Sequence, residues 1–386
     1  MDVTDPELAA DPVRFLGRHR SEDWAWRSDR GVEVLRYDQI WQTLTHRQLR
    51  KDAAEIVAGA GLSGTQFGDA WIVSMLNLTG PEHSRLRGSL AGYFTPGKVE
   101  AWRPIVRDLC ARLIGDPSPG SVVDLIDPLC RTLPGLVFCR MIGAPEEDAA
   151  VLCRASDSVA KVFQEDPRHR DEILTAASEL HAYVLRQLDL RRADPGDDLL
   201  SSMIAFTEGG KLNDDELISM AMLVLEASTE TSTAQIALTI SNLLADPEQW
   251  ALVVDDPSLA KAASIESIRL TPTTGVISRV AVDDVVVDDV VIPAGTSVIC
   301  AITAGQHDES IFVDPDRFDM TRVQLRALIF GGGPHYCVGA ALAQIEIEET
   351  VRYLAEVHPE IALAGRPTLT RNDRAVSVRS LPVSFS

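Results

Sequence analysis

Lysine and aromatic residues are scarce in this chain of 386 residues, and positive charge is in deficit. Five of the 36 basic side chains are lysines, aromatic residues make up 5%, and 57 acidic residues bring the formal charge to −21. A net charge of that sign argues against a nucleic-acid-binding surface and against an anionic-membrane surface. We therefore expect neither nucleic acid nor a membrane among the partners.

Long hydrophobic runs, a leader and paired cysteines are also missing. No stretch reaches the roughly 18 uncharged apolar residues of a membrane span, and the first residues, MDVTDPELAADPVRF, lack the basic and apolar parts of a secretory leader. The six cysteines show no CxxC spacing. Five of them stand in apolar stretches and are interpreted as buried free thiols, which favours a cytoplasmic location. They are Cys110, Cys130, Cys139, Cys153 and Cys300.

The hydrophobic pattern predicts a mainly helical protein with small β-sheets (α+β), not a repeated βαβ unit. Residues 25–45 read as a short strand pair followed by a helix, residues 275–302 as strands with an Asp-Asp turn, and residues 368–385 as a further β region. No linker is visible, so we expect one domain over 1–386. Its β-rich part would cover about 20–80, 275–302 and the C-terminal region, and its helical body about 81–274 and 303–365.

The longest predicted element is a helix from Asn213 to Leu244, about 48 Å long. Asn213 and Glu216 form a capping-box pattern at its start, and Asp246-Pro247 ends it. In its middle the segment STETST places five hydroxyls and one carboxylate, which suit a helix poorly. This segment is either a solvated stripe at a bend or a path that carries protons through Glu230 and Thr231 to a bound ligand.

The segment FGGGPHYCVGA sets Cys337 apart from the other cysteines. Gly331 and Gly333 permit a tightly folded loop, and Pro334 stiffens it. We expect Cys337 at the start of a helix, where free N–H groups and the helix dipole stabilise a thiolate. Gly339 leaves room for a large group over the sulfur. Since no second cysteine or histidine completes a zinc site, a single thiolate ligand suits haem iron.

Residues 330–339 match the FGxGxHxCxG signature of the cytochrome P450 family at every fixed position, and on this motif the chain resembles that family. The resemblance implies the P450 fold, with a long central helix over the haem and the cysteine loop beneath it. It implies that Cys337 ligates the iron of haem b, within a loop formed by Phe330, Gly331 and Gly339. A nucleophilic-cysteine enzyme is the rival interpretation.

Two further sets of residues resemble family motifs. Glu266 and Arg269 form an ExxR pattern, which alone would equally describe a surface ion pair, and Arg317 resembles its usual third partner. The resemblance implies a buried structural network. It also implies that four residues bind the haem propionates, since cations complement carboxylates. These four are His83, Arg87, Arg279 and His335.

The polar segment of the central helix resembles the family's AGxETT pattern. The resemblance implies that Thr231 supplies the hydroxyl on the oxygen side and that Glu230 is the acid behind it, because cleavage of the O–O bond consumes protons. Ser228 stands where the family has glycine. Either its hydroxyl bonds the oxygen or the substrate, or it is a tolerated small residue.

The resemblance implies a monooxygenase that uses O2 and electrons from NAD(P)H to hydroxylate or epoxidise an organic molecule, in bacterial natural-product biosynthesis. Oxidative coupling or cyclisation without oxygen insertion, and haem binding without turnover, are the alternatives. Ferredoxin and ferredoxin reductase are the expected partners, because no flavin or iron–sulfur segment is fused to the chain. Docking would use cations such as Arg85, Arg107 and Arg112. We expect a monomer and leave open whether the substrate is free or bound to a carrier protein.

The resemblance also implies a substrate pocket with mostly apolar walls, which suits a largely apolar organic molecule. Its walls would come from the segment before His83, from the central helix, from the segment after ExxR and from the C-terminal β region. The residues are Phe67, Trp71, Ile72, Met75, Leu76, Ala227, Thr274, Val276, Ile277 and Ser377.

Overall fold

The computed structural model describes residues 1–323, 325–371 and 374–385. The chain divides into two compact units. The first comprises Met1–Lys51, Cys110–Pro128 and Ala234–Ser386, and the second comprises Asp52–Leu109 and Leu129–Thr233. The expectation of one domain over residues 1–386 stays a prediction.

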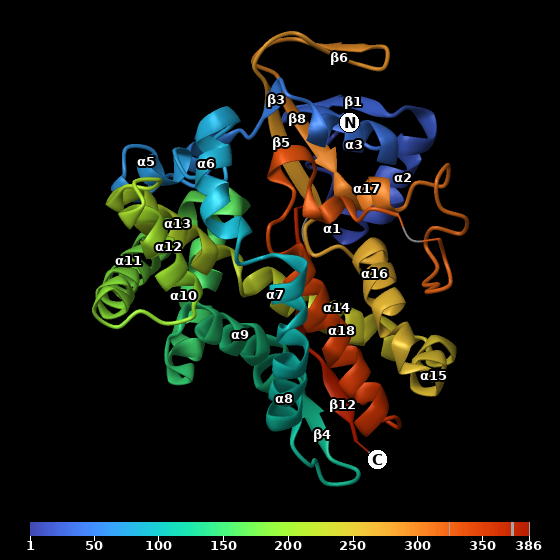
Figure 1. Ribbon diagram of the computed structural model, residues 1–386. Helices are drawn as coiled ribbons and strands as arrows, with labels where there is room; N and C mark the ends of the chain where they lie inside the picture. Colours follow the sequence, from blue (N-terminus) through green and yellow to red (C-terminus); the bar gives the residue numbers. More distant parts are fainter. Residues whose placement is uncertain (324, 372–373, 386) are drawn as a thin grey trace. The chain divides into compact units, whose positions relative to one another are not determined.

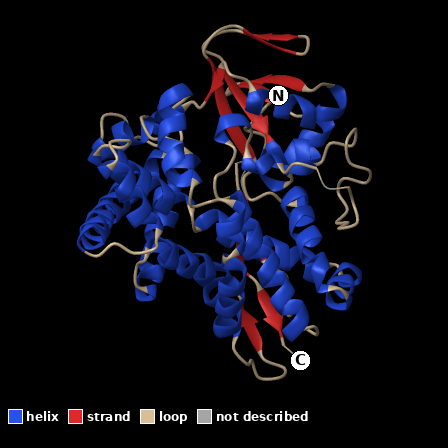
Figure 2. Ribbon diagram, in the orientation of Figure 1, coloured by secondary structure: helices blue, strands red, loops and turns tan. Residues whose placement is uncertain are grey.

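The prediction of a mainly helical protein with small sheets is confirmed (Figure 2). Every strand in the described part of the chain belongs to the first unit. The strands are β1 (Ala25–Ser28), β2 (Gly31–Val34), β3 (Leu49–Arg50), β4 (Val122–Asp124), β5 (Val276–Ala281), β6 (Val285–Val287), β7 (Val290–Ile292), β8 (Ser297–Ala301), β9 (Ala362–Leu363), β10 (Thr368–Arg371), β11 (Val376–Ser380) and β12 (Pro382–Ser384). The strands expected over 25–34, 275–302 and 368–385 are therefore present.

The largest sheet has the order β1-β2-β8-β5-β3 (Figure 1). β2 and β8 run parallel, with Val32 opposite Val298, and the other neighbours in the sheet are antiparallel. The strands are rich in β-branched residues, which pack well on a pleated surface. This sheet fixes the position of β5, the strand that carries Arg279.

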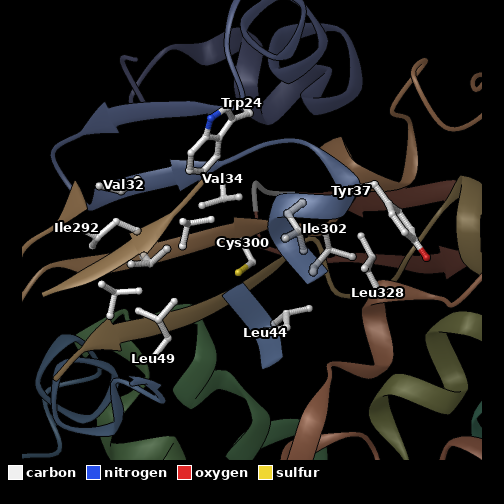
Figure 3. Close-up of a cluster of buried hydrophobic side chains, with 14 of the residues drawn as sticks. Trp24, Val32, Val34, Tyr37, Leu44, Leu49, Ile292, Cys300, Ile302 and Leu328 are labelled. Carbon is white, nitrogen blue, oxygen red and sulfur yellow. The ribbon is translucent and has the colours of Figure 1, made fainter. Parts of the chain in front are cut away.

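The hydrophobic core of the first unit lies against this sheet (Figure 3). Val34 from β2 and Cys300 from β8 are fully buried, and they belong to the same cluster as Leu44 from α3 and Leu328. Burying such side chains contributes about 1.5–3 kcal/mol each. The core therefore ties α3 and the segment before the cysteine loop to the sheet.

The helices of the first unit surround this core and the smaller sheets. Its α-helices are α1 (Pro6–Ala10), α2 (Pro12–Glu22), α3 (Tyr37–Thr45), α15 (Pro247–Asp255), α16 (Ala260–Leu270), α17 (Ile302–Gln306) and α18 (Ala340–Val357). Short 3₁₀ turns are η5 (Pro257–Leu259), η6 (Leu328–Phe330) and η7 (Gly333–His335). Three helical elements cross the boundary between the units: α8 (Trp102–Ile114), the π-helix η1 (Ile126–Arg131) and α14 (Glu230–Ala245).

In its described residues the second unit contains helices, turns and loops but no strand. Its α-helices are α4 (Ala53–Gly59), α5 (Gln66–Ile72), α6 (Gly80–Ala91), α7 (Pro96–Glu100), α9 (Thr132–Ile142), α10 (Ala149–Val159), α11 (Arg170–Ala193), α12 (Leu199–Glu208) and α13 (Asp214–Ala227). Its 3₁₀ turns are η2 (Glu146–Asp148), η3 (Ala160–Gln164) and η4 (Pro167–His169). Placing residues 52–80 in the β-rich part was wrong, because the side chains of Asp52 and Thr65 cap α4 and α5 in that stretch.

The prediction of one unbroken central helix was also wrong. The capping box forms as predicted, since Asn213 accepts from the Glu216 N–H and Glu216 accepts from the Asn213 N–H. However, α13 ends at Ala227, and α14 begins at Glu230. In the described residues, no helix is both long enough and apolar enough to cross a membrane.

Candidate active site

The cysteine loop folds as its glycines predict. Gly331 and Gly333 have positive φ angles of 71° and 60°. The Cys337 N–H donates to the Phe330 carbonyl at 2.8 Å, which closes the loop. α18 begins at Ala340, so Cys337 precedes the helix by three residues rather than standing at its first position. The loop, more than the helix, presents the sulfur.

Two glycines of this loop differ in what surrounds them. A Cβ on Gly332 would come within 2.9 Å of Thr45 Cγ2 and 3.2 Å of Trp41 Cζ3, both on α3. A Cβ on Gly339 would meet nothing within 4 Å. The loop is therefore packed closely on α3 at one end and has open space beside the residue that follows Cys337 by two positions.

The six thiols separate into one exposed and five buried groups. Cys337 is exposed, and the other five cysteines are buried, as predicted. Burial raises the pKa of Cys139, Cys153 and Cys300 to about 12. Within the described residues, no group of three or more His, Cys, Asp or Glu side chains is arranged to hold a metal ion. Cys337 is thus available as a single sulfur ligand.

The Glu–Arg pair on α16 forms a buried network, as predicted. Arg269 donates to both carboxylate oxygens of Glu266 at 2.8 Å, and both residues are 5% exposed. The remaining donors of Arg269 reach the carbonyls of Gln306, Pro315 and Arg317. A buried charge pair with its donors satisfied in this way fixes the loop that runs past it.

The prediction that the Arg317 side chain is the third partner was wrong. Arg322 donates from Nε to Glu266 Oε1 at 3.0 Å, whereas Arg317 is exposed and contributes its carbonyl oxygen. The backbone between Asp314 and Asp319 explains why Arg322 takes the place predicted for Arg317. Asp314 adopts a positive φ of 47°, and the Asp319 N–H also donates to Glu266. These bonds bring the side chain of Arg322, rather than that of Arg317, back to the carboxylate.

His307 and Asp308 serve structure. The His307 ring lies between the Leu270 carbonyl and the Asp316 carboxylate, each at 2.8 Å. Asp308 accepts from the Tyr37 backbone N–H at 2.9 Å. Both residues therefore link α17 to neighbouring elements of the first unit.

Arg279, on β5, is a buried cation with a second cation near it. Its side chain is 2% exposed, and burial lowers the pKa of its guanidinium. Burial and the Arg279 charge together lower the pKa of Lys51 to about 7. His335, on η7, belongs to the same unit and is half-buried. Two cations that disfavour each other's charge in this way favour a bound anion.

A similar pair lies on α6 in the second unit. His83 and Arg87 are four residues apart and share a helix face, as predicted. His83 is buried, and burial together with the Arg87 charge lowers the pKa of its imidazole. A bound anion would stabilise this pair as well.

The break between α13 and α14 has local causes. Ser228 donates its hydroxyl to the Val224 carbonyl, and Ser156 on α10 donates to the carbonyls of Leu225 and Glu226 at 3.2 and 3.0 Å. These side chains satisfy carbonyls that an unbroken helix would bond internally. The Thr229 hydroxyl is buried and bonds no described residue. Of the two interpretations of Ser228, this contact favours that of a tolerated small residue.

Glu230 and Thr231 open α14, immediately after the break. Glu230 is half-buried and Thr231 is exposed. Because two consecutive positions on a helix point in different directions, the acid and the alcohol do not stack on one face. An exposed hydroxyl next to a half-buried acid can exchange protons with a bound molecule.

The second unit contains a cavity of about 600 Å³ between α5, α11 and α13. Of the predicted substrate residues, Phe67 and Trp71 line it. Ile72 and Leu76 are not among its lining residues; like Phe67, they pack against the hydrophobic cluster that contains Val57 and Trp71. Met75 is buried, while Ala227 is exposed at the end of α13.

The predicted substrate residues of the first unit gather near β11. Thr274 forms an antiparallel bridge with Ala375, so the segment after α16 lies beside the strand that carries Ser377. Val276 is half-buried on β5, and Ile277 packs against the core of the large sheet. Ile277 is half-buried beside that core, and its role as a pocket wall stays a prediction.

Two observations fall outside the sequence-based predictions. Glu226 lines the cavity in the second unit but was not predicted as a site residue. The sequence pattern could have indicated Glu226, because it is the one carboxylate in the apolar run MAMLVLEA. Arg85, predicted as a docking cation, is bound to Glu216 at 2.5 Å and is thereby engaged within its own unit.

An exposed cysteine on a glycine-rich loop, in the unit that also holds the buried Glu–Arg network, can serve as the thiolate ligand of a haem iron. The sequence profile of the cytochrome P450 family matches residues 258–352. Luteothin monooxygenase from Streptomyces thioluteus is 31% identical over 389 residues, which cover 100% of this chain and 95% of the relative. 6-Deoxyerythronolide B hydroxylase from Saccharopolyspora erythraea is 32% identical, over 91% of this chain and 86% of the relative.

Solved structures agree with these relatives. Ligand-free CYP164A2 from Mycobacterium smegmatis superimposes with a TM-score of 0.87 at 31% identity, covering 99% of this chain and 98% of that one. The chain belongs to the cytochrome P450 family and is a monooxygenase of that family.

The family implies a haem cofactor, and the residues present fit it. Cys337 is an exposed sulfur beside the open space at Gly339. In the same unit, the buried Arg279 and its neighbour Lys51 favour an anion, which the haem carboxylates would supply.

Proposed function

We propose that the protein inserts one oxygen atom from O2 into a largely apolar organic molecule, by hydroxylation or epoxidation, in a bacterial natural-product pathway. The observation that carries the proposal is the presentation of one exposed sulfur, Cys337, on the glycine loop while the other five thiols are buried. The names of the two relatives, a monooxygenase and a hydroxylase, support oxygen insertion.

Haem b, when bound, supplies the activation of dioxygen. In the first unit, Cys337 would hold its iron as a thiolate, within the loop bounded by Phe330, Gly331 and Gly339, and Arg279 and His335 would bind carboxylates. In the second unit, His83 and Arg87 would do the same. Cations bound to the carboxylates keep the ring from rotating or leaving.

Glu230 and Thr231 would supply protons. Thr231 is exposed at the start of α14, where its hydroxyl can donate to a bound molecule, and the carboxyl of Glu230 can restore the proton from solvent. Ser228 takes no part in this proposal, because its hydroxyl is bonded to the Val224 carbonyl.

Electrons would come from NAD(P)H through a ferredoxin and its reductase, and the enzyme would act as a monomer in the cytoplasm. The lack of a CxxC spacing and the burial of five of the six cysteines support that compartment. Turnover assays with the free and the carrier-bound form of one compound would show whether a carrier protein delivers the substrate.

A reduced carbon monoxide difference spectrum tests the central assignment. The purified protein reconstituted with haem should give the strongly red-shifted Soret band of thiolate ligation, and Cys337→Ser should abolish it. Cys300→Ala, at a buried cysteine, is the matched control and should keep the band. A red-shifted band in Cys337→Ser would mean that another residue ligates the iron.

Labelled dioxygen tests the reaction itself. With a substrate identified by its spin-state change on titration, the product should carry one labelled oxygen atom. A product without label would assign the enzyme to oxidative coupling instead.

A further inference from the structure

The cavity of the second unit has a defined architecture. Its volume of about 600 Å³ is that of a pocket for a small organic molecule. Most of its wall is apolar, with Phe67 and Trp71 from α5, Leu174 from α11 and Met222 from α13. Three helices of one unit therefore enclose a ligand-sized space.

α13 contributes a polar group at each end of the face it presents to this cavity. Asp215, Ser219, Met222 and Glu226 line the cavity, and their spacing of three or four residues places them on one side of the helix. Asp215 is exposed, and Glu226, about 16 Å further along the axis, is half-buried. The cavity thus has an acid near solvent and a second acid at its more enclosed end.

Two of the three ionisable residues of the wall are acids. The three are Asp215 and Glu226 from α13 and His181 from α11, and no lysine or arginine is among the described residues that line the cavity. In a space with low-dielectric walls, such a set favours a cation over an anion.

A cationic ligand would stabilise the ionised form of Glu226. No described residue donates a hydrogen bond to its carboxyl, although its backbone carbonyl accepts from Ser156. Burial raises the pKa of the Glu226 carboxyl to about 8, because the charged form is poorly solvated there. A positive group placed against it would replace the missing solvation.

We propose that this cavity binds a largely apolar molecule that carries a protonated amine, with Glu226 as the counter-ion. The amine would enter past Asp215 and the apolar part would lie against Phe67, Trp71 and Met222. The inference rests on the proposed function in one respect, that the ligand of this cavity is the substrate of the monooxygenase. It makes Glu226 a specificity-determining residue.

Calorimetric titration of the haem-loaded protein tests the charge preference. The ligands share an eight-carbon chain and differ in the head group: N,N-dimethyloctylamine, octan-1-ol and octanoate. The amine should bind at least about tenfold more tightly than the alcohol, and octanoate more weakly than either. Octanoate binding as tightly as the amine would overturn the proposal.

Variants assign the preference to one carboxyl. Glu226→Gln keeps the shape of the side chain and should lower amine affinity about tenfold while leaving octan-1-ol affinity unchanged. Glu208→Gln, at an exposed carboxylate on α12, is the matched control and should change neither. Unchanged amine affinity in Glu226→Gln would show that the amine binds elsewhere, for example to the iron. Loss of the preference in Asp215→Asn alone would likewise overturn the role of Glu226.

The number of protons released on amine binding distinguishes a counter-ion role of Glu226 from a purely structural one. At pH 7 a carboxyl of pKa about 8 is mostly protonated, so ion pairing with the amine should release about 0.9 proton. Titrations in phosphate and Tris, which differ in ionisation enthalpy, measure that number, and Glu226→Gln should release none. Release by wild type and the variant alike would mean that the proton comes from a group other than Glu226, and would contradict the proposal.

The carbon monoxide spectrum of the same preparations separates the two proposals. If the red-shifted band is missing but the amine preference depends on Glu226, the haem-thiolate assignment fails and the binding site stands. If the band is present and the preference is missing, the cavity proposal alone fails.

Discussion

Replacing Arg322 by leucine should destabilise the protein far more than the same change at Arg317. Arg322 donates to Glu266 and to the carbonyls of Val313, Asp314 and Arg317, and its side chain is 12% exposed. Hydrogen bonds to charged groups contribute about 1.5–3 kcal/mol and those to neutral groups about 0.5–1.5 kcal/mol. Glu266 would keep its two bonds to Arg269, so it would not be left unpaired. We therefore expect Arg322→Leu to lower the free energy of unfolding by about 2–4 kcal/mol.

Arg317→Leu should cost less than about 0.5 kcal/mol, because the side chain is exposed and leucine retains the carbonyl that Arg269 and Arg322 use. Urea unfolding of each variant, followed by far-ultraviolet circular dichroism, gives both values. A double-mutant cycle with Glu266→Gln should return a coupling of about 1–3 kcal/mol to Arg322 and none to Arg317. If Arg317→Leu proved as costly as Arg322→Leu, the assignment of the third partner would be refuted.

Three further outcomes follow from the site. Gly332→Ala should destabilise the protein by about 1–3 kcal/mol, because its methyl group would press on α3, whereas Gly339→Ala should leave the urea midpoint unchanged. Thr231→Ala should keep the haem but divert electrons to peroxide, measured as peroxide formed per NAD(P)H oxidised, and Thr233→Ala should not; unchanged coupling in Thr231→Ala would refute the relay. Burial raises the pKa of Glu226 from 4.5 in the unfolded chain to about 8 in the folded protein. Between about pH 6 and 8 the Glu226 carboxyl is therefore ionised in the unfolded chain, whereas in the folded protein it keeps its proton until near pH 8. Wild type should therefore lose about 2 kcal/mol of unfolding free energy relative to Glu226→Gln over that range, and a constant difference would contradict the assigned pKa.

Features that depend on neighbouring residues could be predicted from the sequence. The capping box at Asn213 and Glu216 formed, and the glycines at 331 and 333 adopted the positive φ angles that the loop required. The buried state of five cysteines also followed from their apolar neighbours. These properties are set within a few residues of chain.

Features decided by distant contacts could not be predicted. The central helix was expected to continue through Ser228, but Ser156, on another helix, bonds the carbonyls that the break exposes. Arg317 and Arg322 stand in one short segment, and only the turn between them determines which guanidinium reaches Glu266. Glu226 was visible as a lone acid among apolar residues, yet its cavity forms only when three helices assemble.

The separation of one exposed thiol from five buried ones has a practical consequence. A maleimide applied to haem-free protein at neutral pH should find Cys337 as its main target, because burial keeps the others out of reach and raises the pKa of three of them to about 12. If the haem occupies that sulfur, loading shields it. Mass spectrometry of the labelled chain would then count the cofactor-bearing molecules in a preparation without any optical measurement.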